Sequence, residues 1–271
     1  MRRVLLALAL CALVADPSWA DIGRTARGTI SHANAGAFYE TLTGSITVGA
    51  GSTLVVFLAY EMGQNSESLP FPIDGLSWNG AAMARSVSSP WYPGGGLLFG
   101  GFAHECWTLQ NATAGTGTLV ATCNSTFNQA PVGNFAGTIV EVTGAAAASY
   151  DVSAFNANGI IQSSTEITSP TTTQANETVL ASEAVYIGAG TGSWSNTFST
   201  GQAASIGQLN TDDAYVFTTE INPYVTGRHL TAPSFYSAMI ATFKQADSGN
   251  TTATVYQRSI SGRHRVRRRT P

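Results

Sequence analysis

The chain has 271 residues, of which 44% are hydrophobic and only 11% are charged, with a formal net charge of −3. Its many apolar and aromatic side chains exclude a disordered chain, although the charged fraction lies well below the roughly 25% of typical globular proteins. The length suits one large domain or two small ones. Glycine, serine, threonine, alanine and asparagine replace the charged residues, as is typical of β-rich exported proteins.

The first twenty residues have the three parts of a secretory signal peptide. Met1-Arg2-Arg3 is positively charged, residues 4–15 form an apolar run, and Ser18-Trp19-Ala20 places small residues before Asp21. This pattern predicts cleavage before Asp21. The apolar run is too short for a membrane span, and no later stretch approaches the roughly twenty apolar residues that a span requires. We therefore expect a secreted protein, extracellular or periplasmic, without a membrane span.

Short β-branched or aromatic runs bounded by Gly, Pro, Asn or Ser predict strands along most of the chain. The clearest runs are 44–48, 53–60, 76–78, 83–87, 97–102, 135–142, 177–187, 204–209, 214–219 and 235–243. Asn79-Gly80 is the strongest turn signal, because both residues readily take the positive φ angles of a two-residue hairpin loop. The nearest helix candidate, 144–148, is long enough only for a turn or one helical turn. These features predict an all-β fold, a jelly-roll-like sandwich of two antiparallel sheets forming a single domain over residues 21–247.

Two cysteines remain after the signal peptide, which contains Cys11. If residues 104–123 form a hairpin that folds about Ala114-Gly115, Cys106 lies directly opposite Cys123. A directly opposed antiparallel pair brings the Cα atoms close enough for a disulfide, which would persist in an oxidising compartment. We expect this disulfide; two unpaired buried thiols are the alternative.

The order of the segments resembles a jelly-roll-like β-sandwich module of secreted and phage-associated bacterial proteins that has no assigned function. The resemblance covers residues 43–244 and implies the fold and the extracellular setting, with no catalytic residues to carry over. The two cysteines are not part of its pattern. The matching pieces are 52–56, 76–83, 107–109, 114–116, 138–144, 171–177 and 238–244.

Motifs for catalysis or metal binding are absent from the sequence. The four histidines have no metal-ligand spacing, and there is no Gly-x-Ser-x-Gly elbow or phosphate loop. We expect no catalytic residue, metal or cofactor. Two alternatives stay open. Glu105 and Glu141 could form the carboxylate pair of a glycan hydrolase. Asp212-Asp213 could bind calcium, although adjacent acids more often cap a turn.

Aromatic residues in loops are the better functional signal. Trp91 and Tyr92 lie in the Pro- and Gly-rich segment 90–96, and Trp194 lies among small polar residues at 192–196. Flat rings beside hydroxyls and amides are suited to stack on sugar faces, so these three residues are the candidate ligand-binding residues. The alternative is that both loops fold back and close an end of the sandwich.

The C-terminal segment 248–271 is basic, whereas residues 21–247 carry 5 basic and 15 acidic residues. Such a block of like charge is expected to be disordered and to act as an interaction arm. Its partners would be acidic glycans or polymers, or the acidic body of another copy; nucleic acid is not expected for an exported protein. A solvated tail without function is the alternative. The contact candidates are Arg263, Arg265, Arg267, Arg268 and Arg269.

These observations favour a secreted, non-enzymatic β-sandwich that works at a cell or particle surface. The leading hypothesis is a glycan-binding or adhesive module that uses Trp91 and Trp194. The second is a structural component of an extracellular or phage assembly, with subunit contacts through sheet edges and the basic tail. The third is a glycan hydrolase with Glu105 and Glu141 as its carboxylates.

Overall fold

The computed structural model describes residues 22–33, 39–61, 73–88, 102–123, 133–186 and 193–246. These residues form strands and turns without a helix, and every strand pair among them is antiparallel. The predicted all-β, antiparallel fold is therefore confirmed. The described part contains no helix that could cross a membrane. Instead of two sheets, the described strands form four.

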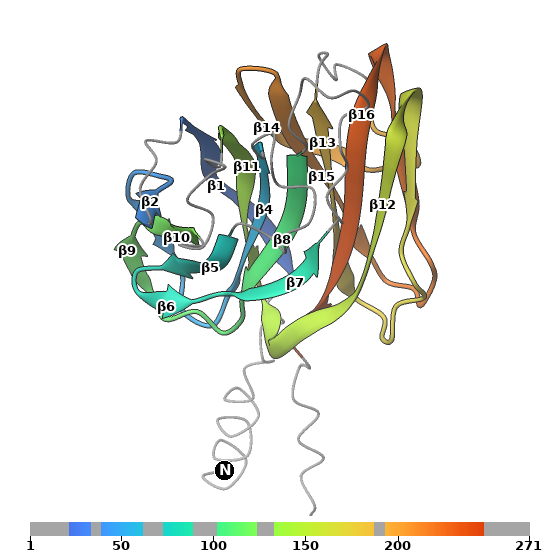
Figure 1. Cartoon of the computed structure of the whole chain (residues 1–271). Coiled ribbons are helices and arrows are strands. Elements are labelled where there is room, and N and C mark those ends of the chain that lie inside the picture. The colour runs from blue at the N-terminus through green and yellow to red at the C-terminus, as the bar shows by residue number, and fades with distance from the viewer. Residues whose placement is uncertain are drawn as a thin grey trace, which may run out of the picture.

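A five-stranded sheet, here called the central sheet, occupies the middle of the molecule (Figure 1). From edge to edge its strands are β1 (Gly23–His32), β11 (Phe135–Thr143), β4 (Thr53–Glu61), β8 (Phe102–Leu109) and β7 (Ala84–Ser88). Residues 53–60 of β4 are all buried, so both faces of this sheet are covered. That burial explains why β4 and β11 read as continuous apolar runs rather than as alternating ones.

Two smaller sheets cover one face of the central sheet. The first, called the small sheet, has the order β2 (Tyr39–Thr41), β10 (Leu119–Cys123), β5 (Ile73–Trp78) and β6 (Ala81–Ala82). The second pairs β3 (Ile46–Val48) with β9 (Gly115–Gly117). Leu54, Val56 and Leu58 of β4 pack here against Leu76 and Leu119.

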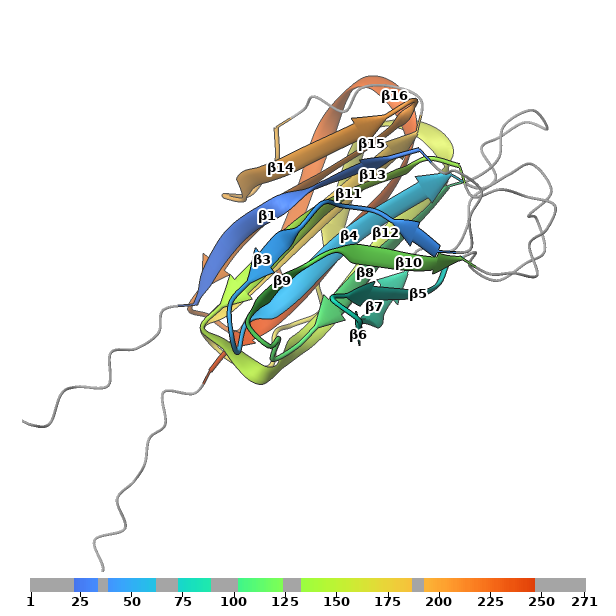
Figure 2. The ribbon, with the colours of Figure 1, turned by 90° about the vertical axis from the view of Figure 1, so that its left-hand side faces the viewer.

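A second five-stranded sheet, called the large sheet, covers the opposite face. Its order is β12 (Ala145–Thr168), β16 (Val225–Gln245), β13 (Glu177–Tyr186), β15 (Leu209–Thr218) and β14 (Ser199–Ile206). Val55 and Phe57 of β4 pack against Leu180 and Met239 of this sheet. Figure 2 shows β14 running beside β1, where the two sheets meet.

The large sheet curls into a half-barrel, because its two longest strands, β12 and β16, change register several times along their pairing. Its face turned away from the central sheet, here called the outer face, carries a separate apolar cluster. Val179, Ala181 and Ile240 belong to it, and Trp194 and Phe198 from the β13–β14 connection pack against them. The outer face of the large sheet thus has its own apolar core, and polar side chains lie at the edges of that core.

The predicted strands agree with the structure in segments whose side chains alternate between apolar and polar or are continuously apolar. Asn79-Gly80 forms the predicted turn between β5 and β6, with φ angles of 48° and 79°. Two expectations were wrong. Residues 145–148 begin β12 instead of forming a turn or helical turn, and Gly207, expected within a strand, takes φ 57° in the turn between β14 and β15. The run 97–102 lies outside the described residues except for Phe102.

The predicted Cys106–Cys123 disulfide does not form, and both thiols are free and buried. β8 and β10 do not pair; Cys106 lies opposite Phe57 of β4, and β10 belongs to the small sheet. Cys106 packs between the central and large sheets, whereas Cys123 packs between the central and small sheets. The two thiols therefore lie on opposite faces of the central sheet, and the whole thickness of that sheet separates them.

Candidate functional site

The predicted ligand-binding residues are only partly within the described structure. Trp91, Tyr92 and the tail arginines, Arg263, Arg265, Arg267, Arg268 and Arg269, lie outside the described residues. Trp194 is described, and its side chain is buried in the outer-face cluster at 8% exposure. The expectation of an exposed Trp194 ring was therefore wrong; the alternative, a loop folded back over an apolar surface, describes it. The reason is that the outer face needs apolar cover.

Glu105 of β8 lies in the core between the central and small sheets with no solvent exposure. Its carboxylate accepts hydrogen bonds from the Tyr60 hydroxyl at 3.0 Å and from Trp107 Nε1 at 2.8 Å, and Arg85 Nε lies 3.2 Å away. Burial raises the pKa of Glu105 to about 7, although these three partners oppose the shift. The group is enclosed by its partners, so its surroundings stabilise the fold rather than admit a substrate.

Glu141 of β11 does not form a pair with Glu105. It makes an ion pair with Arg27 and accepts a hydrogen bond from Gly49 N at 2.7 Å. The two glutamates lie on strands flanking β4, opposite Leu58 and Leu54 respectively. Strand spacing and rise then separate their Cα atoms by about 16 Å, beyond the roughly 5–10 Å of glycosidase carboxylates.

Asp212 and Asp213 point to opposite faces of β15 and do not converge on one cation. Asp213 makes an ion pair with Arg24 of the central sheet, and Asp212 makes one with Arg228 on the outer face. Each acid therefore already has a positive partner. Among the described residues, no group of three or more His, Cys, Asp or Glu is arranged to hold a metal ion.

A polar cavity of about 170 Å³ lies at the margin of the outer face, between β13, β14, β15 and β16. We call it the Glu183 cavity. Apolar lining comes from Val185, Ala203 and Ala204. The polar lining residues are Glu183, Ser205, Asn210, Thr211, Asp212 and Arg228.

The strand register brings the two acids of this cavity together. Glu183 of β13 is the direct cross-strand neighbour of Asp212 of β15. Directly opposed residues have Cβ atoms about 5 Å apart, so two like charges would repel here. Arg228 offsets that repulsion by its ion pair with Asp212, and its side chain is only 9% exposed. The trio is therefore a compact, nearly buried charged group.

Glu183 is held on one side only. Thr165 Oγ1 donates to Glu183 Oε2 at 2.9 Å, and Thr165 in turn accepts from Arg228 N at 3.2 Å. Burial raises the pKa of Glu183 to about 7, with Thr165 and Arg228 opposing the shift. Burial also lowers the pKa of Arg228, which the charge of Glu183 opposes. Near neutral pH, Glu183 can therefore act as either a donor or an acceptor.

Two of the lining residues keep a buried side-chain oxygen on the outer face without a protein hydrogen-bond partner. These atoms are Glu183 Oε1 and Asp212 Oδ1. Thr211 Oγ1 is also unpaired, but Thr211 lies on the face of β15 that is turned to the central sheet, as Asp213 does. Buried polar atoms in native proteins are nearly always hydrogen-bonded, so a cluster of unpaired ones calls for an explanation such as a bound molecule. Both oxygens can accept a hydrogen bond, so the missing partner is one that supplies donors.

A second cavity, of about 240 Å³, lies beside the Asn79-Gly80 turn. It is lined by Trp78, Asn79, Leu109 and Asn111, among other uncharged residues. The Trp78 ring is almost fully buried in the core, so it offers no open face for stacking. The Glu183 cavity, which is lined by charged side chains, is therefore the better candidate for a binding site.

Sequence reasoning missed the Glu183 cavity because its residues come from four strands with no motif. One signal was available: Glu183 interrupts a ten-residue run, Glu177–Tyr186, in which every position is buried. A charge in such a strand requires a buried partner. No pattern in the sequence indicated that Arg228 would be that partner.

Comparison with known proteins gives no further assignment: no family model, curated protein or solved structure matches the chain significantly.

Proposed function

We propose that the protein is an exported glycan-binding module that holds one sugar residue in the Glu183 cavity. The observation that carries the proposal is the pair of unpaired acceptors there, Glu183 Oε1 and Asp212 Oδ1. Sugar hydroxyls are donors, and each can also accept from Arg228 or Asn210. Neutral hydroxyls suit the site because Asp212 already has its charge partner.

The size of the cavity limits the ligand. A volume of about 170 Å³ is well below the roughly 300–1,000 Å³ of typical drug-sized pockets, so it has room for one sugar ring and not for a chain. The module would then recognise the sugar at the end of a glycan chain. Val185 and Ala203 supply apolar contact for the ring carbons, and Ser205 and Asn210 supply further hydrogen-bonding groups.

The decisive experiment is a glycan-array screen of the chain from Asp21, with and without the residues after Asp247. Two substitutions test the cavity: Glu183→Gln keeps the shape, and Asn210→Ala removes an amide at the rim. Glu166→Gln is the matched control, because Glu166 is exposed on β12 of the same sheet. We expect both cavity variants to lose binding by tenfold or more, about 1.4 kcal/mol, and the control to retain it.

Three outcomes would contradict the proposal. If the wild type binds no glycan, the proposed function is wrong. If it binds only acidic glycans, and only when the tail is present, the binding is electrostatic attraction to the tail and not recognition by the cavity. Release of reducing sugar from a bound glycan would make the protein a hydrolase, with the opposed carboxyls of Glu183 and Asp212 as the first residues to test.

A structural role in an extracellular or phage assembly is the second candidate. The observation that favours it is the edge of the large sheet: in the described part, the 24-residue strand β12 pairs only with β16. An unpaired edge can template pairing with another chain. Sedimentation at several protein and salt concentrations tests this role, and association through the basic tail would weaken as salt rises.

Export itself is part of the proposal and rests on the predicted signal peptide. Expression of the full chain in a secreting host, followed by N-terminal sequencing of the product, would place the first residue at Asp21. Retention of residues 1–20 in the mature product would contradict it.

A further inference from the structure

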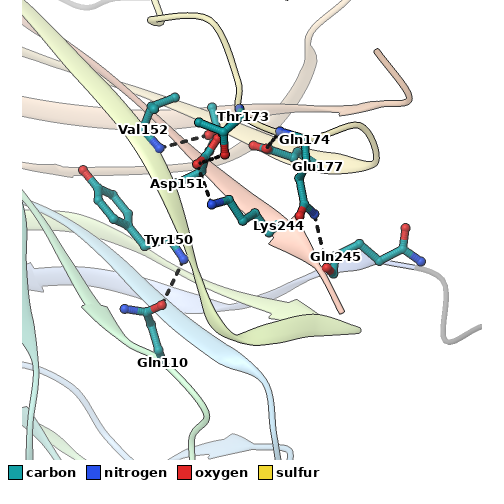
Figure 3. Close-up of polar contacts among 10 residues, drawn as sticks. Gln110, Tyr150, Asp151, Val152, Thr173, Gln174, Glu177, Lys244 and Gln245 are labelled. Carbon is teal, nitrogen blue, oxygen red and sulfur yellow. Dashed lines mark hydrogen bonds and ion pairs between the residues drawn. The ribbon is translucent and has the colours of Figure 1, made fainter. Parts of the chain in front are cut away.

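Lys244 is the only lysine in the chain, and it lies against a carboxylate. It stands near the end of β16, where its Nζ lies 2.8 Å from Asp151 Oδ1 of β12 (Figure 3). The Asp151 side chain is only 2% exposed, and the Lys244 side chain is 28% exposed. Nζ is therefore in direct contact with the carboxyl group whose carbon it would attack.

A second carboxyl group completes the cluster. Glu177 of β13 is the direct cross-strand neighbour of Lys244, and it is fully buried. Burial raises the pKa of Glu177 to about 7, and the neighbouring Asp151 carboxyl adds to the shift. Glu177 Oε2 has no hydrogen-bond partner that donates to it. Glu177 can therefore carry a proton near neutral pH and exchange it with its neighbours.

Thr173 polarises the carboxyl group of Asp151. Its backbone N–H donates to Asp151 Oδ2 at 2.7 Å, and its hydroxyl donates to Oδ1 at 2.5 Å. A backbone N–H aimed at one carboxyl oxygen is the arrangement that stabilises an oxyanion during acyl transfer. The cluster thus contains a nucleophile, an electrophile with an oxyanion donor, and a buried acid, each from a different segment.

We propose that Lys244 and Asp151 condense to an intramolecular isopeptide bond. A bond forms between Lys244 Nζ and Asp151 Cγ, and the bond between Cγ and Oδ1 breaks. The ammonium group gives up two protons, both of which leave with Oδ1 as water, and the amide nitrogen keeps one. Glu177 relays these protons: it donates to Oδ1 and is reprotonated from Nζ. The step needs no oxidant or other co-reactant, because an amine and a carboxylate condense to an amide and water.

The bond would lock the end of the last strand to the beginning of β12. Two backbone hydrogen bonds already hold the end of β16 and the residue after it there: Gln245 N donates to Asn176 O at 3.0 Å, and Ala246 N donates to Gly144 O at 2.9 Å. A covalent link would keep β16 paired when the chain is pulled from its C-terminal side. This inference is independent of the sugar-binding proposal, because the cluster and the Glu183 cavity share no residue.

The test is the intact mass of the purified chain together with the reactivity of its single lysine. The wild type is expected about 18 Da below the mass of its sequence, the mass of one water. In denaturant, an amine-reactive acylating reagent should label only the α-amino group, because the ε-amino group of Lys244 is consumed. Tandem mass spectrometry should place the link between the segments that contain Asp151 and Lys244.

Two variants separate the bond from unrelated loss of water. Lys244→Arg keeps the positive charge and should show its full sequence mass. Glu177→Gln keeps the shape of the acid but cannot relay protons, and it should show the full mass with a reactive lysine. A wild type of full mass with a labelled Lys244 would overturn the proposal, as would a water loss that persists in Lys244→Arg. A bond that still forms in Glu177→Gln would overturn the role given to Glu177.

Discussion

Arg24 of β1 forms an ion pair with Asp213 of β15, and this pair joins the central sheet to the large sheet. The two side chains are 8% and 0% exposed, and the Arg24 guanidinium also lies 4.7 Å from the centre of the Tyr215 ring. The contact is thus a buried charged link between two layers. Removing one partner of such a pair leaves an uncompensated charge in the core.

Arg24→Ala is expected to destabilise the protein by about 3 kcal/mol at pH 8, as measured by urea unfolding. Burial already raises the pKa of Asp213 despite Arg24, so without Arg24 this acid will protonate readily at lower pH. The loss should therefore be smaller at pH 5 than at pH 8. Arg24→Lys, which keeps the charge, should recover part of the stability. Equal losses at both pH values would show that Asp213 does not carry the effect.

The pH dependence of stability follows from three buried glutamates and one histidine. Burial raises the pKa values of Glu105, Glu177 and Glu183 to about 7 from 4.5. The folded state therefore holds three extra protons as the pH falls from 7 toward 4.5, which stabilises it. Burial lowers the pKa of His104 from 6.5 to about 3, so the unfolded state takes up one proton below pH 6.5, which opposes the gain.

The three glutamates outweigh the histidine, so the melting temperature is expected to rise by several degrees from pH 8 to about pH 5. Scanning calorimetry across this range measures it. Below that range His104 continues to oppose folding while the glutamates add nothing more, so the stability should fall again. The variant Glu105→Gln mimics the protonated acid and should flatten the slope by nearly half, because His104 already offsets one of the three glutamates. A melting temperature that falls steadily from pH 8 to pH 5 would contradict the assigned protonation states.

Local patterns in the sequence predicted the strand content but not the pairing of the strands. β4 and β11 were recognisable because burial on both faces makes them continuously apolar. β12 was missed, because its Ala-, Ser- and Asn-rich residues have low strand propensity and its extended form depends on pairing with β16. Long-range pairing also explains why Cys106 and Cys123 do not form the predicted disulfide. Their symmetric spacing is compatible with a hairpin, but β8 and β10 pair with other strands instead.

The candidate site was even less accessible to prediction. Glu183 and Asp212 meet because β13 and β15 pair in a given register, and Arg228 reaches Asp212 from β16; only the charge of Glu183 within an apolar run marks any of the three in the sequence. The carboxylates chosen from the sequence, Glu105 and Glu141, do share one face of the central sheet. The intervening strand β4 and the register separate them, and only the fold supplies that distance.

The separation of Cys106 and Cys123 predicts the thiol chemistry of the folded protein. Burial raises the pKa of the Cys106 thiol far above its usual value, and that of Cys123 to about 11, with Glu40 and Asp74 adding to the shift. Because the thiolate is the reactive form, neither thiol should react with a disulfide reagent in the native protein, and both should react in denaturant. A mass lower by about 2 Da without reductant, the loss of two hydrogens in a disulfide, would refute this expectation.

The Asn79-Gly80 turn gives a prediction with an internal control. Gly80 has φ 79°, a conformation that residues with a Cβ atom seldom adopt, and nothing lies within 4 Å of an added Cβ there. Gly80→Ala is therefore expected to cost about 1 kcal/mol through backbone strain alone. Gly75→Ala, in β5 of the same hairpin, is the control, because a Cβ there also meets nothing within 4 Å and its φ lies outside the positive region. Chemical denaturation should show a loss for Gly80→Ala and none for Gly75→Ala. Equal stabilities would mean that the turn relaxes to another type, and that the register of β5 with β6 does not depend on it.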